Sequence, residues 1–140
     1  MRFIDSNVFL HAFLRPRRGL TDEEQRIKEK AKDIIGLVDE GEEVATTAVH
    51  VSEVVNIVES GLGLQRSLGL LAWVVSKPNI QVYPVTVESY ERALPVAQEG
   101  GVSANDALAY LTMRDNGLAE VYTFDKHFDL LDVNRVPLVR

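Results

Sequence analysis

Short apolar runs recur along the chain and are separated by longer segments in which apolar residues are spaced as in helices. The runs are rich in β-branched and aromatic residues, which is typical of buried strands. They predict strands at residues 2–5, 43–46, 80–85 and 119–124, and a short last strand at 136–139.

The segments between these runs carry helix signals. Thr21, followed three residues later by Glu24, is a capping-box pattern that predicts a long helix as far as Glu40. Asn116 and Gly117 predict the end of the last helix. Helices are therefore expected at residues 7–14, 21–40, 47–60, 87–98 and 103–117.

Strands that alternate with helices favour a mostly parallel sheet with helices on both faces. We expect an α/β fold, a three-layer α/β/α sandwich whose central sheet has four to five strands. The chain has no internal repeat, linker or low-complexity tract, so residues 1–140 are expected to form one domain.

One further segment has helical spacing. Leu64, Leu68, Leu71 and Val75 repeat with this period, which is typical of a core face or of a subunit interface. The preceding GLGLQ has a GxG spacing but neither a third glycine nor a following GK, so it favours a connection between helices over a phosphate loop.

The composition limits the compartment and the partners. The chain has no cysteine, which excludes disulfides and thiolate metal sites. Asp5 interrupts the apolar start, unlike a signal peptide, and no run approaches the roughly 20 apolar residues of a membrane helix, so we expect a cytoplasmic protein without membrane association. The net charge of -6 argues against coating nucleic acid by electrostatics alone. It does not exclude an enzyme whose acids hold cations.

Two predicted strands end at an aspartate. Asp5 closes the first apolar run and Asp125 follows the fourth. In open parallel sheets, ligands bind outside the carboxyl ends of the strands, so both carboxylates belong to that edge. The alternative is that each aspartate only caps the helix that follows it.

Two more acids lie on predicted helices beside apolar neighbours. Glu53 has Val49 and Ile57 one turn away on either side, and an inward carboxylate needs a partner or a metal ion. Asp106 follows Ser103 in a capping-box spacing, which is its structural alternative. A helix start at the carboxyl edge of the sheet also places Asp106 opposite the strand ends.

Four carboxylates gathered at one edge repel each other unless cations neutralise them. Mg²⁺ or Mn²⁺ suits a site made of oxygen ligands. The three histidines show neither an HxxxH nor an HExxH spacing, so a zinc site is not expected, and no GxSxG motif or Walker loop offers other chemistry.

The segments FIDSNVFL, VSEVV, SANDALAYL and TFDKHF, in this order and spacing, resemble the PIN-domain nucleases over nearly the whole chain. Among these the chain is most similar to the small VapC-type toxins of toxin–antitoxin pairs. The resemblance implies polar supporting residues at Asn7 and Thr123. Asp129 is a candidate extra acid or an exposed residue on a closing turn. The resemblance implies an acidic quartet of Asp5, Glu53, Asp106 and Asp125.

The resemblance also implies an activity. It is that of a metal-dependent endoribonuclease using Mg²⁺ or Mn²⁺, the toxin of a type II pair, with RNA as substrate and a VapB-like antitoxin as protein partner. A homodimer is expected through the segment from Leu64 to Val75. Arg15, Arg17 and Arg18 are candidates for binding RNA phosphates, or form a solvated basic loop.

The residues alone leave two alternative hypotheses for the function. A receiver domain or a dehalogenase-like phosphatase also places aspartates at strand ends with Mg²⁺, but Asp5 is followed by Ser6, and Asn7 stands where a DxD motif needs an acid. A non-catalytic interaction module, with the acids as caps and surface charges, is the alternative of another class. Metal binding separates it from a nuclease.

Overall fold

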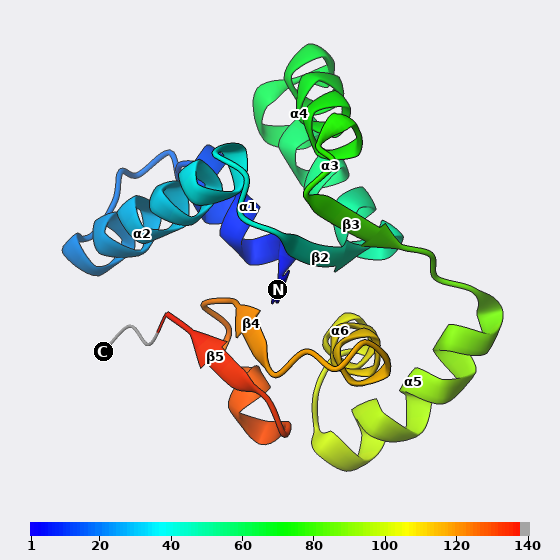
Figure 1. The fold of residues 1–140 in the computed structure, drawn as a ribbon. Coiled ribbons are helices and arrows are strands. Elements are labelled where there is room, and N and C mark those ends of the chain that lie inside the picture. Colours follow the sequence, from blue (N-terminus) through cyan, green and yellow to red (C-terminus); the bar gives the residue numbers. More distant parts are fainter. Residues whose placement is uncertain (138–140) are drawn as a thin grey trace.

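The computed structural model describes residues 1–137, which are built around a parallel five-stranded sheet (Figure 1). Neighbouring strands pair in the order β3-β2-β1-β4-β5, and every pair is parallel. The carboxyl ends of the strands therefore share one edge, and the predicted α/β fold with a mostly parallel sheet is confirmed. The strands are β1 (Arg2–Ile4), β2 (Val44–Thr47), β3 (Ile80–Tyr83), β4 (Glu120–Tyr122) and β5 (Asn134–Val136).

Helices cover both faces of this sheet. Four of them lie on one side, and two with a short 3₁₀ helix lie on the other (Figure 1). The first group is α1 (Ser6–Phe13), α2 (Asp22–Asp39), α3 (Ala48–Leu62) and α4 (Leu64–Ser76), and the second is α5 (Val87–Gly100), α6 (Ala104–Asp115) and η1 (Lys126–Leu130).

The side chains of the central strands alternate between these two layers, as they do in any strand. Ile4 and Val44 are buried in the core cluster formed with α1 to α4. Phe3 and Ala45 are buried on the opposite face, in the cluster that includes Met113 of α6 and residues of η1. Burial on both faces explains why the strands are continuous apolar runs in the sequence.

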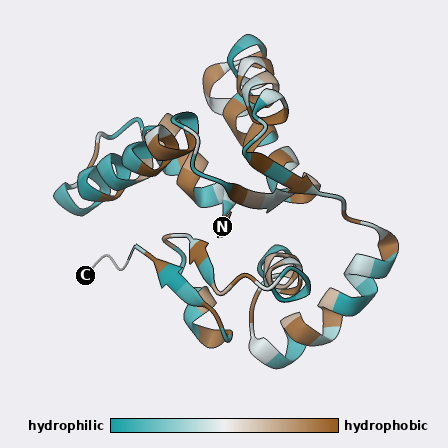
Figure 2. Ribbon diagram, in the orientation of Figure 1, coloured by the Kyte–Doolittle hydropathy of each residue, from teal (hydrophilic) through white to brown (hydrophobic). Residues whose placement is uncertain are grey.

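The elements of the fold differ in hydropathy. In Figure 2 the long helix α2 is largely hydrophilic, while β3 is largely hydrophobic. The capping box predicted at the start of α2 is present, because the Thr21 and Glu24 side chains each accept a hydrogen bond from the other's backbone N–H. Among the residues described, no helix is long and apolar enough to cross a membrane.

A buried lysine ties α2 to the end of α1. The Nζ atom of Lys28 donates to the carbonyl oxygens of His11, Ala12 and Leu14 at 3.3, 3.1 and 3.1 Å. The last carbonyls of a helix have no partner within the helix, and a positive charge there is favourable. Lys28 therefore acts as a side-chain cap for α1.

The elements near the C-terminus differ from the prediction. Residues 126–130 form η1, which was not predicted, and β5 begins at Asn134 rather than at 136. Residues 138 and 139 of the predicted strand lie outside the described residues. The apolar pattern misses the start of β5 because this strand lies at the edge of the sheet and pairs only with β4.

The leucine stripe of α4 is not part of the core. Leu64, Leu68 and Val75 are 52%, 45% and 66% exposed, whereas Ser67 and Val74 are the buried residues of this helix. The core alternative is therefore wrong for the three exposed residues. The interface alternative stays a prediction.

Candidate active site

A cleft of about 440 Å³ lies at the carboxyl edge of the sheet. It brings together acids from the end of β1, from α3, from the start of α6 and from the segment after β4. All four acids of the expected quartet line it, and so does Asn7. The lining residues are Asp5, Ser6, Asn7, Glu53, Ser103, Ala104, Asn105, Asp106 and Asp125.

Asp5 has both roles that the sequence suggested. It is the N-cap of α1, where its Oδ1 accepts from the backbone N–H of Ser6 at 2.9 Å, and it also lines the cleft. Its Oδ2 accepts from the Thr123 hydroxyl at 2.8 Å. Donors on both oxygens fix the plane of this 5% exposed carboxylate.

The direction of the Thr123 bond follows from its other contacts. Thr123 Oγ1 accepts from the Asn7 side-chain amide at 3.2 Å and from the backbone N–H of Asp125 at 3.0 Å. Both lone pairs are then used, so the hydroxyl proton is left for Asp5. Asn7 Oδ1 also accepts from the backbone N–H of Phe124 at 3.3 Å. Thr123 and Asn7 thereby tie the loop after β4 to the start of α1.

Asp125 likewise combines a cap with a place in the cleft. Its Oδ1 accepts from the backbone N–H of His127 at 2.9 Å as the N-cap of η1, and it lies 2.8 Å from Nδ1 of the same histidine. Ligand atoms of Asp106, Asp125 and His127 all lie within 4.8 Å of one another, close enough to share one cation. His127 was not predicted as a site residue, because the histidines of the sequence were compared only with the spacings of zinc motifs.

Glu53 is held by two donors. Its Oε2 accepts from the Ser6 hydroxyl at 3.2 Å and from the Asn105 amide at 3.0 Å. The face of α3 that carries Glu53 is less buried than its apolar residues predicted, because Ile57 on the same stripe is 40% exposed. Ser6 and Asn105 were also missed as site residues, although each is a direct sequence neighbour of a predicted acid.

The clustering changes the protonation of the acids. Burial raises the pKa of Asp5 to about 7, the charges of Asp106 and Asp125 add to this, and the bonds from Thr123 and Ser6 oppose it. Burial also raises the pKa of Asp106, and the charge of Asp125 adds to the effect. Without a counter-ion the cleft therefore holds more negative charge than its surroundings favour.

These groups fit a divalent ion. Carboxylate oxygens from four segments face one cleft, and hard cations such as Mg²⁺ and Mn²⁺ prefer oxygen ligands. Ser6, Asn105 and Thr123 hold two of the carboxylates by hydrogen bonds, as outer partners of metal ligands do. Asp106 and Asp125 are close enough to share one ion with His127, and Asp5 and Glu53 line the same cleft.

One deeply buried group lies behind Asp5. The Nε2 atom of His50, in the first turn of α3, is 3.7 Å from Asp5 Oδ1. Burial lowers the pKa of His50 to about 4, so the ring is neutral near pH 7 and this approach is not an ion pair.

Thr123 bonds Asp5 without lining the cleft itself, and the four remaining predicted residues also lie outside the lining. Asp129 is exposed and lies in η1 rather than on a turn, where Arg135 binds it with two hydrogen bonds at 3.1 and 3.0 Å. Arg18 makes a similar pair with Glu24, at 2.8 and 2.9 Å. Arg15 and Arg17 follow the C-terminal end of α1, whereas the acids lie at its start.

Fold and site together define a three-layer α/β/α protein with a carboxylate-lined cleft at the carboxyl edge of its sheet. The PIN domain family model matches residues 2–134, and the chain belongs to the PIN domain family. The predicted resemblance to this family is thereby confirmed. No curated protein matches the chain significantly in sequence.

Solved structures share the fold. VapC20 of Mycobacterium tuberculosis, described as a sarcin-ricin loop cleaving toxin, is 20% identical with a TM-score of 0.68 over 93% of this chain and 92% of that one. VapBC2 of Rickettsia felis, bound to a DNA fragment from its promoter, is 10% identical with a TM-score of 0.61 over 96% of each chain. FitAcB of Neisseria gonorrhoeae is 20% identical with a TM-score of 0.59 over 96% of each chain.

Proposed function

We propose that the protein is a metal-dependent endoribonuclease that hydrolyses RNA phosphodiester bonds. The observation that carries this proposal is the convergence of Asp5, Glu53, Asp106 and Asp125 on one cleft. A bound Mg²⁺ or Mn²⁺ ion supplies an activated water and neutralises the charge that develops on the phosphate.

The protein's own part is to orient the acids and to admit the polyanion. The Thr123 and Ser6 donors orient Asp5, and Ser6 and Asn105 orient Glu53. Loading the cleft with a cation reverses its local sign, so a protein of net charge -6 can accept RNA there. No histidine or lysine is required as the general base.

We infer further that this nuclease is the toxin of a type II toxin–antitoxin pair and acts in the cytoplasm. The support is the fold shared with VapC20, a toxin, and with chains of the VapBC2 and FitAcB assemblies. The expected partner is a VapB-like antitoxin.

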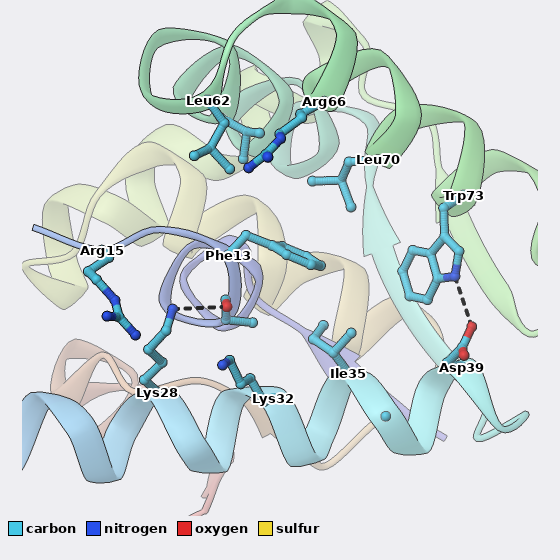
Figure 3. A pocket seen from close by; sticks show the side chains of 13 residues that line it. Phe13, Arg15, Lys28, Lys32, Ile35, Asp39, Leu62, Arg66, Leu70 and Trp73 are labelled. Carbon is cyan, nitrogen blue, oxygen red and sulfur yellow. Dashed lines mark hydrogen bonds between the residues drawn. The ribbon is translucent and has the colours of Figure 1, made fainter.

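A groove on the α1–α4 face suits part of such a partner (Figure 3). It measures about 770 Å³, with Phe13, Leu70 and Trp73 among its apolar residues and Lys32 and Arg66 among its basic ones. We propose that an apolar antitoxin segment lies here. From the groove, α1 leads about 12 Å back to the cleft, which about four extended residues span. A basic residue of the antitoxin then pairs with the quartet and displaces the ion.

A homodimer through α4 is the second part of the assembly we propose. The exposed stripe of Leu64, Leu68 and Val75 is the surface that supports it. Apolar surface on one helix face is typical of association between subunits.

The nuclease proposal is tested with Asp125→Asn and the matched Asp132→Asn. Asparagine caps a helix as well as aspartate does, so Asp125→Asn removes a charge while keeping the cap of η1. Asp132 precedes β5 and therefore lies at the amino edge of the sheet, away from the cleft. We expect RNA cleavage that needs Mg²⁺ or Mn²⁺, a loss of about 100-fold or more in Asp125→Asn, and no change in Asp132→Asn. Cleavage that persists in chelator contradicts the metal mechanism, and a chain that binds no metal favours the interaction module.

A further inference from the structure

His50 is a buried polar residue to which the proposed chemistry assigns no role. It is 1% exposed and lies in the first turn of α3, three residues before Glu53. Its ring edge contacts Phe3 of the adjacent strand, with the ring centroids 5.2 Å apart. Among the described residues, its Nε2 atom has no hydrogen-bond partner. A buried polar group without a partner needs a physical reason.

The contacts of Thr47 determine which ring nitrogen carries the proton. Thr47 Oγ1 accepts from the backbone N–H of His50 at 3.2 Å and lies 2.6 Å from His50 Nδ1. If Nδ1 accepts the Thr47 proton, Nε2 carries the ring proton, and this nitrogen lies 3.7 Å from Asp5 Oδ1. In the opposite tautomer, the hydroxyl proton of fully buried Thr47 lacks an acceptor in this part of the chain, and the Nε2 lone pair faces a carboxylate. The first arrangement gives the Thr47 hydroxyl proton an acceptor and leaves Nε2 with a proton to donate.

Asp5 Oδ1 is the carboxylate oxygen beside Nε2, and it lies beyond hydrogen-bond distance in the structure. The two atoms are 3.7 Å apart, about 0.7 Å longer than an ordinary N–H···O bond. Thr46 Oγ1 also lacks a partner within the described residues and shares with His50 a cavity of about 10 Å³, which is at the lower limit for one water. Once it is ionised, the Asp5 carboxylate is the stronger acceptor of the two.

We propose that His50 is a positioning residue for Asp5, donating from Nε2–H to Oδ1 and holding this carboxylate in the orientation in which it binds the divalent ion. The proposal rests on the proposed nuclease function. His50 itself does not ligate the ion, because its side chain is buried and is not among the residues that line the cleft. Donors behind a metal-binding carboxylate are worth 10- to 100-fold in metal affinity.

The test compares His50→Leu, which removes the donor, with His50→Gln, whose side-chain N–H reaches a similar position. His11→Leu is the matched control, because His11 packs on Phe124 and is not among the lining residues of the cleft. Titration calorimetry with Mn²⁺ and with Mg²⁺ is expected to show affinity about 10-fold or more weaker in His50→Leu, within about threefold of the parent in His50→Gln, and unchanged in His11→Leu. A folded His50→Leu protein with the parent's affinity overturns the proposal.

A second measurement needs neither metal nor a folded His50→Leu variant. Long-range ¹H–¹⁵N spectra of the parent protein report which His50 nitrogen is protonated. We expect the Nε2–H tautomer and a shift of its proton signal in Asp5→Asn. A proton on Nδ1 overturns the proposal, as does a signal that ignores Asp5→Asn but moves in Thr46→Val. If the parent binds no metal, the nuclease proposal fails, while these spectra still decide whether His50 contacts Asp5.

Discussion

The substitution Asp106→Asn tests separately how much the clustered acids destabilise the metal-free fold and how much they contribute to metal binding. The Asp106 carboxylate lies within 4.8 Å of that of Asp125, and two charges at this separation repel by about 3 kcal/mol at an effective dielectric constant of about 20. Partial exposure of Asp125 and salt reduce this to roughly 1 to 2 kcal/mol. The acid also favours the first turn of α6 by less than about 1 kcal/mol, so removing the charge preserves or raises stability without metal.

The change in stability caused by Asp106→Asn depends on pH, and its direction follows from the pKa of Asp106. The pKa of Asp106 is raised in the folded state, so its ionisation opposes folding fully above that pKa and not at all below the unfolded value near 3.8. The stability gain of Asp106→Asn in chelator is therefore expected at pH 8, as a melting temperature higher by up to about 8 °C, and it fades as the pH falls toward about 4.

Adding metal reverses the order of the two proteins. An ion present at 100 times its dissociation constant stabilises the parent protein by about 2.7 kcal/mol, and Asp106→Asn forfeits most of this gain. The assay is thermal unfolding followed by circular dichroism in chelator and in Mn²⁺, with Asp132→Asn as control. A large drop in melting temperature of Asp106→Asn in chelator at pH 8 refutes the repulsion argument. It then indicates that Asp106 serves chiefly the start of α6.

In metal-free protein, NMR titration of the Asp5 carboxyl carbon is expected to give a pKa of about 7 that falls when Mg²⁺ is added; an ordinary pKa near 4 contradicts the burial argument. Lys28→Met leaves three carbonyls at the end of α1 without their donor and is expected to cost about 2 to 4 kcal/mol in urea unfolding, whereas exposed Lys32→Met costs less than about 0.5 kcal/mol. Leu68→Glu is expected to convert a dimer to a monomer in sedimentation at tens of micromolar; a parent protein that is already monomeric rules out the α4 interface.

Much of the fold was predictable because the sheet is buried on both faces. Its inner strands are short apolar runs, and a strand covered by helices on both sides must be apolar throughout. The edge strand β5 does not have to be apolar throughout. Its first two residues, Asn134 and Arg135, are polar, so the apolar pattern does not show where this strand begins. The exposed leucines of α4 show the opposite limit, since helical spacing marks an apolar face without showing what covers it.

For the site, a helix cap and a cleft residue were treated as alternatives, although one aspartate can be both. Asp5 and Asp125 do both, because the helix that follows each strand begins at the carboxyl edge of the sheet. The supporting contacts depend on distances across the fold: Thr123 bonds Asp5 from 118 positions away, and Asn105 bonds Glu53 from 52. No local spacing encodes such pairs, and the approach of His50 to Asp5 belongs to the same class.

In the proposed reaction, water held at the acidic cleft by a metal ion would attack the phosphate, rather than the RNA's own 2′-hydroxyl. The most direct test is mass spectrometry of the first cleavage products formed with Mg²⁺ or Mn²⁺ in ¹⁸O-labelled water. We expect one ¹⁸O atom in the terminal phosphate of the product and no 2′,3′-cyclic phosphate, with no products in chelator or with Asp125→Asn. A 2′,3′-cyclic phosphate end, or the same products formed in chelator, contradicts it.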